Sequence, residues 1–243
     1  MTTAQFTLIA ILLLGMSSTG VAQGIKVVTE DTSYSYLQDG KVAGTATAVV
    51  EATLQRAGLN DYSVTIYPWA RAYDMALQEK NVLIYLIART PEREALFKWV
   101  GEIEHIDYPM YKLRERSDIQ VRDLQEAKHY SVGVVRDDVR HQYLKEQGFT
   151  KLVVSANNRD NFKRLLNRQV QLVPMPESDV AMQCLDAQFD CARLEKTFTP
   201  ELTTSLYMAY SLSTDDEIVA RTREAFDNLK TEGTVQQLIH GDH

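Results

Sequence analysis

The stretch NVLIYLIARTPEREALFKWVG, residues 81–101, decides how the chain is organised. Residues 82–88 are all apolar and include several β-branched side chains, and a short run with such sharp ends predicts a buried strand. Thr90 and Pro91 follow it, and these residue types favour the N-cap and the first position of a helix. We therefore expect a helix to begin directly after a buried strand.

The expected helix start favours an anion, and Arg93 lies in its first turn. A helix N-terminus carries free N–H groups and a partial positive charge. Arg93 adds a planar cation that can hold a carboxylate through two parallel hydrogen bonds. The alternative is an exposed side chain that pairs with Glu92 or Glu94 and contributes little. Carboxylate capture is the hypothesis that this stretch supports.

Two motifs in the same stretch resemble those of a known family. Residues 90–93 (TPER) and 97–101 (FKWVG) look like the "T-P-x-R … F" motif of periplasmic amino-acid-type solute-binding proteins, bacterial extracellular family 3. Its opening strand and glycine loop are matched by residues 27–30 (VVTE), Tyr34 and residues 39–44 (DGKVAG). The similarity extends from about residue 25 to residue 239. In that family the arginine at the position of Arg93 binds the α-carboxylate of the ligand, and the resemblance implies the same role here.

The resemblance implies an α/β, two-lobed periplasmic-binding-protein-like fold (type II), in which each lobe is a mostly parallel sheet flanked by helices. The chain itself alternates strands and helices, which indicates parallel α/β units, and this rhythm is interrupted near residues 108–111. We expect residues 23–108 and 206–243 in lobe 1 and residues 112–198 in lobe 2. Hinge crossings are expected near 109–111 and 199–205. The return crossing comes from the family, whose lobes close around a ligand.

Composition narrows the class of partner. The chain has 26 Lys and Arg against 33 Asp and Glu, a formal net charge of −7, so neither nucleic acid nor an anionic membrane is an expected partner. Residues 1–22 are predicted to be a signal peptide, because the apolar run 6–14 is too short to span a bilayer and Gly20-Val21-Ala22 fits a cleavage site. No Lys or Arg precedes Lys26, which departs from the usual pattern, and a buried N-terminal helix is the alternative. We expect export to the periplasm.

The chain has two cysteines, Cys184 and Cys191. In an exported protein, two cysteines close together favour a disulfide. On one unbroken helix, residues seven apart would be too distant to join, so the bond requires a turn between them. Their spacing matches no four-ligand zinc pattern.

Aromatic and charged residues near the predicted strand ends are candidate ligand contacts. Tyr34 and Trp69 could hold the ligand body between aromatic rings, and Arg71 could be a second anion contact at the same sheet edge. The structural alternatives are simple packing for Tyr34 and a core position for Trp69. Further candidates around the expected cleft are Thr90 and Tyr85.

Several positions depart from the family. Small hydroxyl residues usually precede the position of Thr90, where this chain has Tyr85, Leu86 and Ala88. The second lobe usually offers a glycine-hydroxyl loop after its strand, and here Asp138 stands in an Arg-Asp-Asp sequence. The acid that holds the α-amino group of the ligand has no certain match, and Glu177 and Asp179 are the candidates, each with a solvated helix start as its alternative.

Two further helix starts follow from cap residues. Asn158 is expected to cap a helix, and residues 214–217 (TDDE) form a capping box for a long last helix.

Catalytic motifs are missing from the sequence: it has no GxSxG, HExxH, P-loop or GxGxxG after a strand. We expect no enzyme activity, no cofactor and no metal site. The predicted function is a monomeric solute-binding protein that captures a small, amino-acid-like carboxylate for the permease of an ABC importer. The alternatives are a ligand-presenting partner of a membrane sensor, a dehydratase-like periplasmic enzyme on the same fold, and a structural protein with a collapsed cleft.

Overall fold

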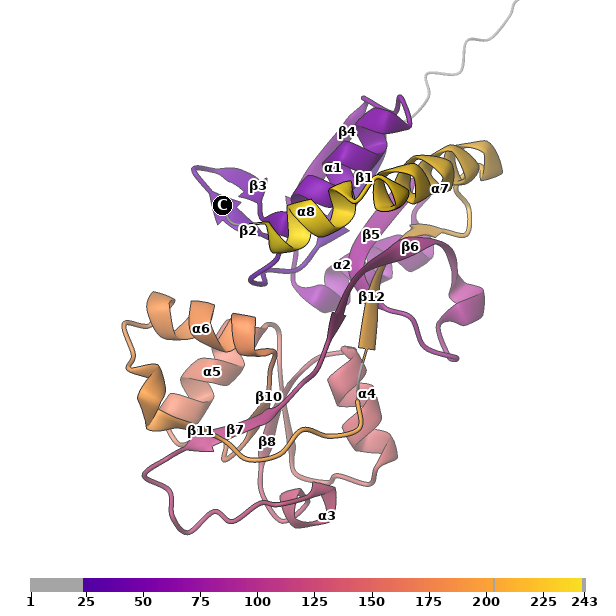
Figure 1. The fold of residues 1–243 in the computed structure, drawn as a ribbon. Helices are drawn as coiled ribbons and strands as arrows, with labels where there is room; N and C mark the ends of the chain where they lie inside the picture. Colours follow the sequence, from indigo (N-terminus) through magenta and orange to yellow (C-terminus); the bar gives the residue numbers. More distant parts are fainter. Residues whose placement is uncertain (1–23, 203, 242–243) are drawn as a thin grey trace, which may run out of the picture.

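The elements fall into two lobes joined by two neighbouring chain segments (Figure 1). The computed structural model describes residues 24–202 and 204–241, so the predicted signal peptide lies outside the described residues. The strands are β1 (Ile25–Thr29), β2 (Tyr36–Gln38), β3 (Lys41–Ala43), β4 (Tyr62–Ile66), β5 (Val82–Ala88), β6 (Phe97–Ile106), β7 (Met110–Leu113), β8 (Val132–Val135), β9 (Leu152–Ser155), β10 (Val173–Pro174), β11 (Leu194–Lys196) and β12 (Thr204–Ser211). The helices are α1 (Thr45–Arg56), α2 (Trp69–Gln78), α3 (Leu124–Ala127), α4 (Val139–Glu146), α5 (Asn158–Leu166), α6 (Glu177–Asp186), α7 (Asp216–Thr231) and α8 (Thr234–His240), with 3₁₀ turns η1 (Glu94–Leu96) and η2 (Cys191–Arg193).

The first lobe is built on a sheet with the order β4-β1-β5-β12-β6. β1 is parallel to β4 and β5, whereas β12 is antiparallel to β5 and β6. Every residue of the central strand β5 is buried, as its apolar run predicts. One core cluster joins β5 to α1, α7 and α8, and a second joins it to α2, so helices cover both faces of the sheet.

The second lobe has shorter strands. β8 and β9 are parallel, and β7 pairs antiparallel with both β10 and β11. Helices α5 and α6 pack their apolar side chains, including Phe162, Leu165 and Val180, against this small sheet. Figure 1 shows the lobe below the first, connected to it by β6 on the way out and by β12 on the return. Those two strands pair from Thr204–Ile106 to Ser211–Phe97.

The predicted helix after β5 is wrong. Residues 90–93 form a turn in which the Arg93 N–H donates to the Thr90 carbonyl at 3.0 Å, and η1 is the single helical turn that follows. Pro91 suits the second position of such a turn as well as a helix start, because its φ is fixed. Residues 97–106 alternate and pair with β12, which arrives from the far end of the chain, so tertiary pairing overrides the local helix signals.

Two helix caps lie one residue away from the predicted positions. The side chain of Asn157, not Asn158, accepts from the Asp160 N–H at the start of α5. Asp215, not Thr214, caps α7 by accepting from the Glu217 N–H. Thr214 is buried, and its hydroxyl lies 2.9 Å from the Ser211 hydroxyl.

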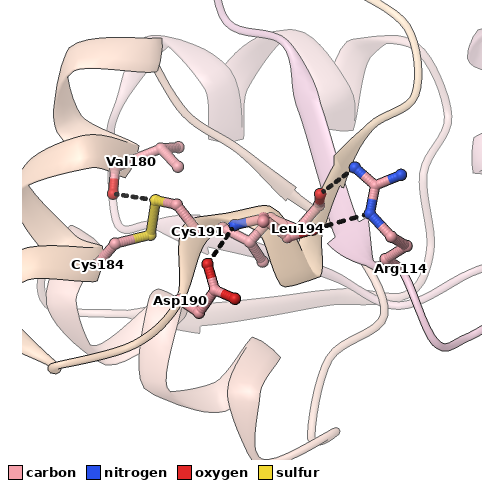
Figure 2. The surroundings of a disulfide bond; sticks show 7 residues. Arg114, Val180, Cys184, Asp190, Cys191 and Leu194 are labelled. Carbon is pink, nitrogen blue, oxygen red and sulfur yellow. Dashed lines mark hydrogen bonds between the residues drawn. A yellow bond between two sulfur atoms is a disulfide. The ribbon is translucent and has the colours of Figure 1, made fainter.

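The predicted disulfide joins the end of α6 to η2 (Figure 2). Cys184 and Cys191 have Cα atoms 5.7 Å apart, because the chain turns between residues 186 and 191 as the bond requires. Arg114 donates to the Leu194 carbonyl at 3.0 Å and holds the segment after η2 against β7. Over the described part of the chain, none of the helices is long and apolar enough to cross a bilayer.

Candidate functional site

A cavity lies between the two lobes at the carboxyl ends of β1 and β5. The first lobe lines it with side chains that include Glu30, Tyr34, Trp69, Leu86 and Arg93. The second lobe contributes Asp138, Arg140 and Asp179. Parallel strands bring residues that are distant in sequence to one sheet edge, and such an edge is where ligands meet open α/β sheets.

Arg93 is buried in this cavity, with 1% of its surface exposed. Its Nη1 donates to the Ala88 carbonyl at 3.3 Å, and its Nη2 donates to the Asp137 carbonyl at 3.0 Å and to Gln142 Oε1 at 3.2 Å. Its buried Nε has no hydrogen-bond partner among the described residues. The exposed ion-pair alternative is therefore wrong for this side chain, which instead reaches across to the second lobe. Glu94 pairs with Arg89.

Trp69, which belongs to the first lobe like Arg93, also contacts the Asp137 carbonyl. Its Nε1 donates to the Asp137 oxygen at 3.0 Å, and the Trp69 side chain is buried. The Arg93 guanidinium carbon lies 5.0 Å from the centre of the Tyr73 ring and 5.7 Å from that of Trp69. Asp137 has a φ of 58°, an uncommon conformation for a residue other than glycine. The second-lobe loop thus presents one backbone oxygen to two buried donors.

On the second-lobe side, Asp138 and Arg140 form a buried ion pair. Asp138 Oδ1 lies 2.6 Å from Arg140 Nε, and Oδ2 lies 2.9 Å from Nη2. Burial alone would raise the pKa of Asp138, but the charge and hydrogen bonds of Arg140 hold that pKa below its usual value. Arg140 also donates to the Pro174 carbonyl and stacks over the Tyr108 ring at 4.9 Å. Both charges are satisfied inside the protein.

Two more carboxyls face the cavity. Asp179 Oδ1 accepts from the Ser33 N–H at 2.8 Å, a contact between the lobes, and burial raises the Asp179 pKa. Burial, together with the charge of Asp138, raises the pKa of Glu30 to about 8. Glu30 is 9% exposed. Three acids and two arginines therefore meet in one cavity.

Five of the nine predicted contacts line this cavity: Arg93, Tyr34, Trp69, Asp138 and Asp179. Tyr34 is half-buried, and burial raises its pKa.

The structure places the other four outside the cavity. The Tyr85 hydroxyl is buried against Ser35 and Thr47, and burial raises the Tyr85 pKa to about 12. Thr90 belongs to the turn before η1. Arg71 is exposed, with its guanidinium 4.5 Å from the Tyr67 ring centre. Glu177 is exposed and pairs with Lys196.

Sequence reasoning missed Glu30, Arg140 and Tyr108 as cavity residues. A usable signal existed for Glu30, which follows β1 directly and so stands at the same sheet edge as Arg93. Arg140 has no such signal, because nothing in the sequence separates it from the other charged residues of the chain.

The comparisons with known proteins give the fold. No protein-family model matches the sequence, and no curated protein matches it. Among solved structures, a histidine kinase sensor domain described as similar to periplasmic binding proteins matches with a TM-score of 0.80 at 16% identity, over 89% of this chain and 94% of that one. The arginine-, lysine-, histidine-binding protein ArtJ from Geobacillus stearothermophilus matches with 0.77 at 16%, over 91% and 96%. An ancestral arginine-binding protein bound to glutamine matches with 0.75 at 17%, over 90% and 98%.

The chain has the two-lobed fold of periplasmic binding proteins. This confirms the fold class predicted from the family resemblance. The match spans nearly the whole length of each of these structures, so both lobes and both crossings belong to the common fold. In this fold, the cavity described above lies at the interface of the lobes.

Proposed function

We propose that the protein captures a small carboxylate-bearing solute between its lobes, with Arg93 as the anion clamp. The observation that carries the proposal is the burial of this guanidinium in the cavity with its Nε unpartnered. A buried cation needs compensation. Its acceptors on the second lobe, the Asp137 carbonyl and Gln142, are uncharged, so a ligand carboxylate would be a stronger partner.

The aromatic rings beside Arg93 support a ligand body of amino-acid size. Tyr34 lines the cavity from the loop between β1 and β2, and Trp69 lines it from the start of α2. The two neighbours named for binding take amino acids with an α-carboxylate: arginine, lysine and histidine in one, glutamine in the other. We infer the same general class for this chain.

Closure of the two lobes is part of the proposal. We place the hinges near residues 109–111 and 199–205, between the paired crossing strands and the second lobe. Residues 23–108 and 206–243 would then form lobe 1, and residues 112–198 lobe 2. Opening would break the contacts of Trp69 and Arg93 with Asp137 and admit the ligand.

The test is calorimetric titration of ligand copurified with the native protein into wild type, Arg93→Ala and Arg93→Lys. Losing one partner of a buried charge pair costs roughly 2–5 kcal/mol, so the alanine variant should bind about thirtyfold more weakly or worse. Lysine should also weaken binding, because an ammonium cannot make the planar two-bond grip. Arg71→Ala is the matched control, since Arg71 is exposed and outside the cavity.

Melting curves separate binding from folding. Arg93 is buried, so Arg93→Ala should also lower the free energy of unfolding. Arg93→Lys keeps the charge and serves if the alanine variant does not fold. Unchanged affinity in a folded Arg93 variant would contradict the carboxylate clamp.

We propose a periplasmic location, release of residues 1–22 and delivery of the solute to an ABC permease by a monomer. A further solved structure, the substrate-binding protein of an amino acid ABC transporter, matches with a TM-score of 0.76 at 11% identity over 89% of this chain and 97% of that one, and it supports delivery. The sensor-domain neighbour favours a second candidate, ligand presentation to a membrane sensor. Binding of purified permease or sensor to the loaded protein would separate the two roles.

An enzyme on this fold would need an acid or base in the cleft with a perturbed pKa. Glu30 meets that condition. We nevertheless propose a non-enzymatic role, because the neighbours described above are binding or sensor proteins. Recovery of the copurified ligand unchanged after long incubation with the protein is the expected result, and a conversion product would overturn it.

A further inference from the structure

The cavity between the lobes is small for a binding site. Its volume is about 30 Å³, which is room for about two or three water molecules, whereas pockets for small molecules usually measure roughly 300–1,000 Å³. Asp138, Val139 and Arg140 line it, and each of the three is at most 6% exposed. Among the described residues of the second lobe that line the cavity, Arg140 has the longest side chain. The second lobe therefore limits the space through this residue above all.

Arg140 is held in place by partners in its own lobe. Its Nε and Nη2 lie 2.6 Å and 2.9 Å from the two carboxylate oxygens of Asp138, and its Nη1 donates to the Pro174 carbonyl at 3.2 Å. Asp138 also caps α4, where its Oδ1 accepts from the backbone N–H of Arg140 at 2.7 Å. The Asp138–Arg140 pair is therefore tied to the second lobe, and it enters the space between the lobes whenever they close.

We propose that the Asp138–Arg140 pair selects the solute by size, so that the site binds a carboxylate with no side chain or a very short one and excludes longer solutes. The inference rests on the proposed function and deepens it, because it adds a limit on size to the carboxylate that Arg93 holds. The limit comes from packing. A longer solute must either displace the pair or hold the lobes apart.

Both of these changes are unfavourable. A solute that pushes Arg140 away from Asp138 leaves two buried charges without partners, and breaking a buried ion pair is strongly destabilising. A solute that holds the lobes apart breaks contacts between them, such as the 2.8 Å hydrogen bond from the Ser33 N–H to Asp179. Each cost increases with the length of the solute, so the shortest carboxylates should bind best.

Glycine, L-alanine and L-glutamine are the probes, because each is a zwitterion with an uncharged side chain and they differ in size. Calorimetric titration into wild type should give affinities that fall in the order glycine, alanine, glutamine. Glycine should bind about tenfold or more tightly than glutamine, because extra methylene groups in a packed site commonly cost at least that factor. The ratio of two affinities is the readout, since a loss of folded protein would not change it.

Two double variants separate the size of the Arg140 side chain from its charge. Asp138→Ser together with Arg140→Ala removes the long side chain and both charges, and serine still suits the N-cap of α4. Asp138→Ser together with Arg140→Met removes the same charges but keeps a long, unbranched side chain. Replacing both members of a buried ion pair at once leaves no unpaired charge, so both variants should fold, and melting curves check this.

The alanine variant should gain about tenfold or more in its affinity for glutamine relative to glycine, because the space is now open. The methionine variant should retain the preference for glycine. Equal gains in the two variants would show that the charges, and not the size of the side chain, set the preference, and would overturn the proposal. A folded alanine variant with no gain would also overturn it. If the alanine variant does not fold, the order of the three affinities in wild type decides.

Failure of size selection and failure of the carboxylate clamp give different results. Wild type that binds glutamine as tightly as glycine, with both depending on Arg93, overturns size selection and leaves the clamp intact. A preference for glycine that persists at unchanged affinity in Arg93→Lys contradicts the clamp and leaves size selection intact. Where none of the three probes binds, a copurified ligand no larger than alanine supports size selection, and a larger one overturns it.

Discussion

At the scale of single residues, Leu86 is under strain beside the cavity. It lies within β5 with a φ of 60°, opposite a register shift between Tyr207 and Met208 of β12. A left-handed conformation costs roughly 1–2 kcal/mol for a side chain other than glycine, and such residues collect at functional sites. The bulge turns the Leu86 side chain into the cavity lining.

This strain predicts an unusual order of stability. Leu86→Ala and Leu86→Gly both lose buried side-chain contacts, but glycine also relieves the left-handed backbone. We expect the glycine variant to be more stable than the alanine variant by about 1 kcal/mol in urea unfolding. The usual order for a strand, with alanine the more stable, would show that the backbone relaxes without glycine.

The raised pKa of Glu30 predicts how the free energy of unfolding depends on pH in the absence of ligand. Its folded-state pKa of about 8 lies above its usual value of 4.5, so the folded protein binds the proton more tightly than the unfolded chain. This contribution is fully present below pH 4.5 and is lost as pH rises towards 8. Glu30→Gln should therefore become increasingly more stable than wild type from pH 5 to pH 8 in urea unfolding. Parallel curves for the two proteins would contradict a raised pKa.

The residues of the site differ in how far their neighbours in the sequence predict their role. Arg93, Tyr34 and Trp69 could be predicted because each belongs to a motif or a strand–helix junction. Glu30 has a local signal in its place directly after β1, but Arg140 could not be separated from the many other charged residues, because its importance comes from burial between lobes that are formed by distant segments.

At the scale of elements, the sequence predicts a helix or strand best where no tertiary contact competes with the local preference. β5 has the bounds that its apolar run predicts. The segment after β5 fails because Thr90 and Pro91 suit a turn and a helix equally, and pairing with β12 decides between them. A strand partner more than 90 residues away leaves no local signal.

The disulfide ties α6 to η2 and carries a stability prediction (Figure 2). Cys184→Ala together with Cys191→Ala should lower the free energy of unfolding by roughly 2–3 kcal/mol, mainly because the unfolded chain gains freedom. Urea unfolding of oxidised wild type and of the double variant measures it. Reductant should destabilise wild type and leave the double variant unchanged, and equal stability of all samples would contradict the prediction.

At the scale of the molecule, contacts between the lobes lie both inside and outside the cavity. Inside, Arg93 and Trp69 reach the Asp137 carbonyl. At the rim, Ser33 donates to Asp179, and Arg159 of α5 lies 3.2 Å from Asp31 of the first lobe and 3.2 Å from Asp186 of α6. Several separate contacts therefore join the lobes, which is compatible with the reversible closure proposed above.

The Arg159–Asp31 ion pair should stabilise the closed form by an amount that decreases as the salt concentration rises. Arg159→Ala removes one ion pair between the lobes, worth roughly 0.2–1 kcal/mol for exposed charges, and should shift the population towards the open form by up to about fivefold. Arg168→Ala is the matched control, because Arg168 is also exposed but pairs with Glu115 inside the second lobe. Distances between fluorescent labels at Leu37 and Lys163, exposed positions in opposite lobes, report the population. The two variants should differ at low ionic strength and converge near 1 M salt, where screening acts within about 3 Å. Identical distance distributions for the two variants at low salt would show that the pair does not hold the lobes together. A difference between them that remains at high salt would mean that Arg159 acts through packing and not through its charge.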